Sequence, residues 1–82
     1  MNRQDLVTAV REELAVAAPD VPPDTAEHVL LRSELQVDSL ALLELVARLE
    51  YRFNTSVPDE DWPRLASIGE IGDYLAESLV GA

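Results

Sequence analysis

The segment from Asp38 to Phe53 constrains the fold more than any other part of this chain. Apolar residues recur there at helical spacing over sixteen positions, which predicts a helix roughly 24 Å long. Asp38 is a favoured N-cap, because its carboxylate can accept a hydrogen bond from the amide of Leu40 or Ala41. Asn54 is a suitable left-handed terminator. We expect the buried face of this helix to contain Leu40, Leu43, Val46, Ala47 and Phe53, broadened by Leu45 and Leu49.

The rest of the chain predicts two more long helices and a short one. Residues 4–17 carry an apolar stripe of Leu6, Val10 and Leu14, widened by Ala9, Val16 and Ala17. Residues 67–79 begin with Ser67 and Glu70 in the form of a capping box, followed by the stripe of Ile68, Ile71, Leu75 and Leu79. Pro58 and Pro63 restrict residues 59–65 to a short helix. We therefore expect a single all-α domain over residues 1–82, a small bundle of three main helices plus one short helix, with a long first loop at 19–37.

Composition narrows the function before any motif is considered. The chain has 82 residues, no Cys, no Lys and one His, His28, which falls in the long loop. We interpret His28 as a solvated loop residue, and we expect neither a metal site nor an enzyme, since no nucleophile has a base to serve it. A net charge of −10 disfavours nucleic acid and anionic membranes and favours partners with basic patches. With no apolar segment long enough to span a bilayer and no apolar signal region, we expect a cytoplasmic monomer.

One ordered set of motifs points to a known family. Asp38-Ser39-Leu40 is followed by Glu44-Leu45-Val46, Leu49-Glu50, Phe53, Pro58-Asp59-Glu60-Asp61 and Asp73-Tyr74-Leu75. From about Glu34 to Leu75, half the chain, this order resembles the acyl carrier protein family. The resemblance implies that Ser39 carries a covalent 4′-phosphopantetheine, with Asp38 and Leu40 flanking it, and that the thiol of this arm holds acyl groups as thioesters. It also implies a phosphopantetheinyl transferase as partner, together with an acyltransferase, a ketosynthase or other acyl-processing enzymes.

The physical setting of Ser39 suits such a role. A carrier needs a hydroxyl that an outside enzyme can reach, and the first residue of a helix is accessible. The transferase supplies the base and the metal, so the carrier need not activate its own serine. A phosphodiester at this position would lie at a helix N-terminus, where free amides and the helix dipole favour negative charge.

The resemblance further implies where partners and the acyl chain would bind. Partners would dock along the second helix through Asp38, Glu44 and Glu50. Ala41, Tyr51 and Arg52 stand where fatty-acid carriers commonly place acids, and Gln36 replaces the glycine usual just before the motif. These departures favour a carrier for polyketide or other specialised-metabolite enzymes, such as those of antibiotic biosynthesis, over fatty acid biosynthesis. The positions implied for acyl-chain contact are Val46, Val57, Trp62, Leu65 and Ile71, and the bulk of Trp62 predicts a shallow cavity.

Three alternatives remain open from the sequence. A peptidyl carrier usually shows a Gly-Gly pair before the serine, whereas this chain has Gln36-Val37-Asp38. A D-alanyl-type carrier shares the Asp-Ser dipeptide. A cofactor-free acidic helical adaptor would keep the same helices, with Ser39 as no more than a neighbour of the cap.

Overall fold

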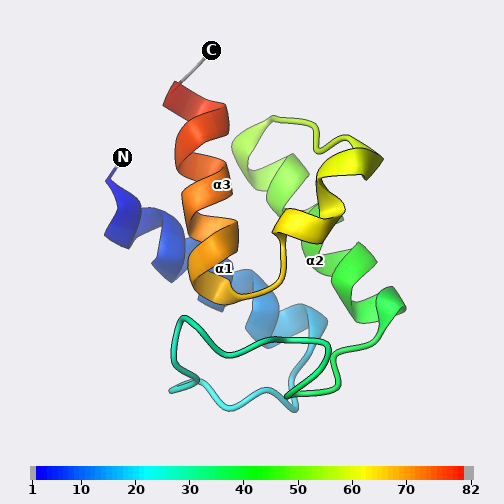
Figure 1. Cartoon of the computed structure of the whole chain (residues 1–82). Helices are drawn as coiled ribbons and strands as arrows, with labels where there is room; N and C mark the ends of the chain where they lie inside the picture. The colour runs from blue at the N-terminus through cyan, green and yellow to red at the C-terminus, as the bar shows by residue number, and fades with distance from the viewer. Residues whose placement is uncertain (1, 81–82) are drawn as a thin grey trace.

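The computed structural model describes residues 2–80, which form four helical elements (Figure 1). These are α1 (Arg3–Ala17), α2 (Ser39–Phe53), the 3₁₀-helix η1 (Asp59–Arg64) and α3 (Ile68–Val80). Each boundary lies within one residue of the range expected from the sequence. Within the described residues no strand forms, and Leu30 and Ser67 make only an isolated antiparallel bridge. The prediction of a small all-α bundle is confirmed.

The bundle is built around α1, which packs against both α2 and α3, while η1 packs against α3 (Figure 1). Val10 of α1, Leu45 of α2 and Ile68 of α3 are each at most 1% exposed. Helices α1 and α3 approach closely at Gly72, where an added Cβ would meet Cγ2 of Val7 at 2.9 Å. Glycine at this position lets the two helices approach closely.

The predicted buried face of α2 is wrong in part. Leu40 and Leu43 are 76% and 52% exposed, and Ala47 is exposed as well. The face that packs into the core carries Leu42, Leu45, Val46 and Leu49. Both sets obey helical spacing, because α2 has apolar residues on two faces. The sequence pattern alone could not tell which face meets α1.

A smaller correction applies to α1. Val16, expected to widen the stripe, is 54% exposed, whereas Val7 is 1% exposed. Two residues correspond to about 200° around a helix, so Val16 lies nearly opposite Leu14. Val7 instead continues the face of Leu6 and Val10 toward α3.

The predicted helix ends are confirmed. Oδ1 of Asp38 accepts a 2.8 Å hydrogen bond from the amide of Ala41. Asn54 ends α2 in the left-handed conformation, with φ 52° and ψ 51°. At α3 the hydroxyl of Ser67 accepts from the amide of Glu70 at 3.2 Å.

The long loop between α1 and α2 is pinned across the base of the bundle (Figure 1). Leu31 is fully buried, and its amide donates to the carbonyl of Ala66 at 2.9 Å. The amide of Gly69 donates to the carbonyl of Glu27 at 3.0 Å. The loop is therefore held against the bundle although it contains no helix, and it leads directly into the start of α2.

Candidate functional site

Ser39 is the first residue of α2 and its side chain is exposed. Asp38 before it is extended, with φ −80° and ψ 175°, and caps the helix. The cap holds the start of the helix in place and leaves the hydroxyl of Ser39 pointing out of the bundle's core. Ser39 is thus a fixed but accessible hydroxyl, as the sequence predicted.

A tight turn over residues 30–37 brings an arginine back to this serine. The amide of Val37 donates to the carbonyl of Leu31 at 2.9 Å and closes the turn. Oε2 of Glu34 accepts from the amide of Leu30 at 2.8 Å. Across the turn, Nη2 of Arg32 donates to Oγ of Ser39 at 3.1 Å.

The turn depends on an unusual backbone at Gln36. Its φ is 58°, in the left-handed region that glycine enters without steric cost and other residues enter rarely. Gln36 stands where glycine is usual just before the motif in the family that the sequence resembles. The structure shows why glycine is suited to this position.

The hydrogen bond to Arg32 also limits what Ser39 can do. Within the described residues Arg32 is the only side chain that the serine hydroxyl contacts by a hydrogen bond. A guanidinium is always protonated and has no acceptor, so it cannot take the proton of the hydroxyl. The arrangement provides an accessible hydroxyl beside a positive charge, and it leaves activation to an external enzyme.

An apolar groove of about 410 Å³ lies beside this site. Arg32 forms part of its wall, which links the groove directly to Ser39. The other lining residues come from the long loop, α2, η1 and the segment after η1: Leu30, Ser33, Leu42, Trp62, Pro63, Leu65 and Ala66. The indole Nε1 of Trp62 is buried and has no hydrogen-bond partner among the described residues.

The residues expected to contact an acyl chain divide into two groups. Trp62 and Leu65 line the groove, and Leu65, which is 4% exposed, also belongs to the core. Val46 and Ile71 are 3% and 2% exposed and belong to the core, and Val57 packs against that core. The structure therefore brings two of the five residues to the groove and places the other three within the packed interior or against it.

The three acidic residues expected to bind partners have different surroundings. Glu44 is exposed on α2. The carboxylate of Asp38 is engaged as the helix cap. Oε2 of Glu50 accepts a 2.8 Å hydrogen bond from the amide of Val57 and so orders the loop after α2.

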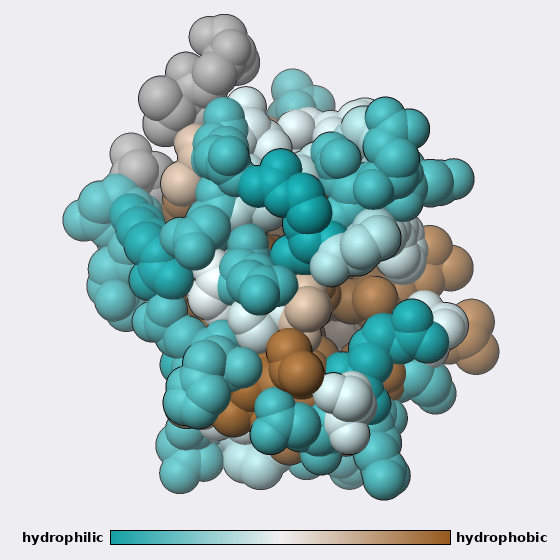
Figure 2. Space-filling model, viewed as in Figure 1, coloured by the Kyte–Doolittle hydropathy of each residue, from teal (hydrophilic) through white to brown (hydrophobic). Residues whose placement is uncertain are grey.

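The exposed outer face of α2 is more apolar than we expected from the sequence. Leu40, Leu43 and Tyr51 are 76%, 52% and 91% exposed. Figure 2 shows hydrophobic surface at the right-hand edge of a mostly hydrophilic molecule, on the side where α2 lies in Figure 1. Leu40 directly follows Ser39, and Leu43 lies about one helical turn further along α2.

The two arginines of α2 are matched by acids of α1. Oε1 of Glu13 lies 2.9 Å from Nε of Arg48, and its Oε2 lies 2.9 Å from Nη1 of Arg52. Arg52 also pairs with Glu12 at 2.8 Å. Burial opposes the ionisation of Glu13, but hydrogen bonds from Arg52 and Arg48 outweigh it, so the pKa of this carboxyl lies below its usual value. The positive charge of α2 is therefore used within the bundle.

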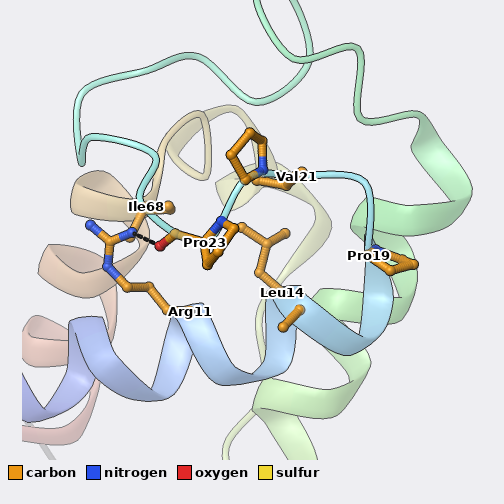
Figure 3. A pocket seen from close by; sticks show the side chains of 8 residues that line it. Arg11, Leu14, Pro19, Val21, Pro23 and Ile68 are labelled. Carbon is orange, nitrogen blue, oxygen red and sulfur yellow. Dashed lines mark hydrogen bonds between the residues drawn. The ribbon is translucent and has the colours of Figure 1, made fainter.

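A second hollow, of about 220 Å³, lies under the proline-rich start of the long loop. In Figure 3, Arg11 and Leu14 rise from α1 toward Val21 and Pro23 of the loop, and Ile68 of α3 closes one side. Nη1 of Arg11 donates to the carbonyl of Pro23 at 3.3 Å. No residue of α2 or η1 lines this hollow, so it is separate from the site at Ser39.

Other sequence expectations bear less on the site. His28 is exposed in the loop. Among residues 2–80, no cluster of three or more His, Asp or Glu side chains is arranged to hold a metal ion. The described helices include none with the length and apolar character required to traverse a bilayer.

Sequence reasoning missed Arg32 and the other residues that line the groove beside Trp62 and Leu65, namely Leu30, Ser33, Leu42, Pro63 and Ala66. Arg32 precedes Ser39 by seven residues in a segment without helical periodicity. Only the turn that closes at Val37 places the two side chains together. No spacing rule for helices or strands would have found this pair.

Comparisons with known proteins agree on residues that include this site. Residues 4–75 match the family model described as "Phosphopantetheine attachment site". The chain is 41% identical to an acyl carrier protein of Streptomyces coelicolor over 76 residues, covering 93% of this chain and 76% of that protein. It is 33% identical to an acyl carrier protein of Helicobacter pylori over 75 residues, 92% of this chain and 91% of the relative. A non-reducing polyketide synthase of Preussia isomera shares 33% identity over 63 residues, which is 77% of this chain and 2% of the synthase.

Proposed function

Since this chain belongs to the acyl carrier protein family, we propose that Ser39 is the residue to which its 4′-phosphopantetheine is attached. The protein is an acyl carrier, with covalent 4′-phosphopantetheine as its cofactor. The observation that supports Ser39 is its exposed hydroxyl on the first residue of α2, beside Arg32. The amides of the first helical turn and the guanidinium both favour the negative charge of a phosphodiester.

The proposal leaves no chemical step to this chain's own side chains. The terminal thiol of the arm would hold the acyl group, and partner enzymes would supply the catalysis. The chain's contribution is to present Ser39, to hold the base of the arm and to offer a docking face. We place this carrier in the cytoplasm with its acyl-processing partners, as a protein that enzymes act on.

Partner enzymes would dock along the outer face of α2. Glu44 supplies an exposed charge there, and Leu40 and Leu43 supply apolar area next to the attachment point. Asp38 and Glu50 stay in the proposed docking set, although both carboxylates also have structural hydrogen bonds. A face that combines one free acid with apolar side chains suits partners of the polyketide or specialised-metabolite type better than partners selected by acidic charge alone.

The acyl chain would lie in the groove between the long loop and η1. Trp62 and Leu65 support this assignment because both line the groove. Val46 and Ile71 are already packed in the core, so a long chain would have to displace them in order to enter the bundle. We therefore propose a shallow acyl site. Large NMR shift changes at Val46 and Ile71 on loading a long chain would contradict it.

The attachment is tested by loading the protein and weighing it intact. The apo protein is incubated with coenzyme A, magnesium and a broad-specificity phosphopantetheinyl transferase. We expect a mass gain of one phosphopantetheinyl group for the wild type, and none for Ser39→Ala. Ser56→Ala is the matched control, because Ser56 is an exposed serine of the loop after α2, and it should load normally. A mass gain that persists in Ser39→Ala would refute the attachment at Ser39. No mass gain in the wild type would favour the cofactor-free helical adaptor instead.

A further inference from the structure

Arg32 differs from the other arginines of the chain in what it contacts. Arg3, Arg48, Arg52 and Arg64 each pair with at least one carboxylate. Arg11 donates to the backbone carbonyls of Pro23 and Thr25. Within the described residues, Arg32 has a single hydrogen-bond partner, the neutral hydroxyl of Ser39 at 3.1 Å. Its positive charge is therefore unmatched in a chain whose net charge is −10.

We propose that Arg32 binds the phosphodiester that links the arm to Ser39, and so sets the direction in which the arm leaves the protein. This inference rests on the proposed attachment at Ser39. The phosphorus would be bonded directly to Oγ, the atom that Arg32 already contacts. A planar guanidinium can donate two parallel hydrogen bonds to phosphate oxygens, which makes arginine well suited to this group.

The charge at the site supports the same assignment. A phosphodiester adds one negative charge next to the carboxylate of Asp38, which caps the helix and is exposed. The N-terminus of α2 offsets part of this repulsion through its free amides and dipole. Arg32 supplies a full positive charge at the same point, so the loaded form gains an ion pair that the unloaded form lacks.

The backbone around Arg32 is held even though its side chain is exposed. Leu31 next to it is fully buried and its amide is bonded to Ala66, while Val37 closes the turn onto Leu31. The guanidinium therefore starts close to its place before any phosphate is present. Little ordering is then needed on loading, which favours binding.

Arg32 also determines which way the arm would run. It is both the partner of Ser39 and part of the wall of the apolar groove. A phosphate held by Arg32 would direct the arm toward Leu42 and Trp62, on the groove side of α2. Without this contact the arm would be free to extend over the outer face of α2, on which Leu43 lies.

The test compares loaded wild type with Arg32→Gln and Arg32→Lys, after intact mass has shown that each carries the arm. The matched control is Arg3→Gln, which makes the same charge change on α1. The first readout is the ³¹P chemical shift of the phosphodiester, measured folded and in denaturant. We expect the folded-minus-denatured difference to be largely lost in Arg32→Gln, partly kept in Arg32→Lys and unchanged in Arg3→Gln. In wild type it should shrink toward 1 M salt, where the Debye length is about 3 Å.

The second readout is the emission of Trp62, the only tryptophan in the chain. We expect conversion from the unloaded to the loaded form to change this emission in wild type and Arg3→Gln, and to change it much less in Arg32→Gln. A loaded Arg32→Gln protein with the ³¹P shift and Trp62 response of wild type would overturn this inference alone. A wild-type protein that gains no mass would overturn the proposed attachment as well, so the two failures are distinguishable.

Discussion

The hydroxyl of Tyr74 donates a 2.7 Å hydrogen bond to Oδ2 of Asp61 and thereby ties α3 to η1. Asp61 directly precedes Trp62, which forms part of the groove wall. Tyr74 is only 5% exposed, and the guanidinium of Arg64 lies 5.0 Å from its ring centre. This contact, together with the ion pair of Arg64 with Glu77, holds against α3 the element that shapes the groove beside the proposed attachment site.

Replacing Tyr74 with Phe should loosen η1 without opening the core. Because the lost hydrogen bond has a charged acceptor, we expect the free energy of unfolding at neutral pH to fall by about 1.5–3 kcal/mol. Denaturant unfolding measures this change. Hydrogen exchange should show faster opening of residues 59–64 than of α1.

Tyr74 should also make the stability of the fold depend on pH. Burial, followed by the hydrogen bond to Asp61 and its negative charge, raises the pKa of Tyr74. In the unfolded chain a tyrosine titrates at about pH 10, so above that pH the unfolded state loses a proton that the folded state keeps. Stability should therefore be complete below about pH 10 and fall as pH rises through the folded pKa. Tyr74→Phe should weaken this alkaline loss, whereas Tyr51→Phe, at a 91% exposed position, should leave it unchanged.

Substitutions at Gln36 should change the stability of the protein through the turn that brings Arg32 to Ser39. Its φ of 58° places a side chain in a region that costs about 1–2 kcal/mol for residues other than glycine. Gln36→Gly removes that cost but gives the unfolded chain more freedom, so we expect a gain of up to about 1 kcal/mol. Gln36→Val should lose about 1–2 kcal/mol because a β-branched residue fits this region poorly.

Ser33→Gly is the control for that pair, because Ser33 is exposed in the same turn and has no positive φ. It should be neutral or slightly destabilising. Thermal unfolding of all three variants measures the differences. Equal effects of glycine at residues 33 and 36 would show that the left-handed backbone at Gln36 is not strained.

Local signals predicted much of this fold because they act over a few residues. Asp38, Asn54 and Ser67 mark helix ends through hydrogen bonds or backbone angles that their own side chains favour, and the structure has all three as expected. The prediction of the buried face of α2 was wrong because Leu40 and Leu42 satisfy helical spacing equally well. The pairing of Arg32 with Ser39 depends on how a non-helical turn closes, which periodicity does not describe.

The corrected face of α2 is tested by truncating leucines on its two sides. Leu42 is 4% exposed and Leu43 is 52% exposed. Leu42→Ala should lower the free energy of unfolding by about 2–5 kcal/mol, through lost burial and the cavity left behind. Leu43→Ala should change it by less than about 1 kcal/mol. Similar losses of stability at both positions would contradict the buried face that the structure shows and support the one expected from the sequence.

Asp38 allows its role as a cap to be separated from its proposed role in binding partners. Asn caps a helix about as well as Asp, whereas Ala costs about 1 kcal/mol. We therefore expect Asp38→Asn to keep nearly the stability of wild type and Asp38→Ala to lose about 1 kcal/mol, in denaturant unfolding of the unloaded protein.

If the charge of Asp38 attracts the transferase, both variants should load more slowly at low salt, by a similar factor, and this deficit should shrink as salt rises. If Asp38 acts only through the helix start, Asp38→Asn should load at the wild-type rate at every salt concentration and only Asp38→Ala should be slow. Asp20→Asn, which removes an equal charge at an exposed position of the long loop, shows how much of any deficit comes from net charge alone.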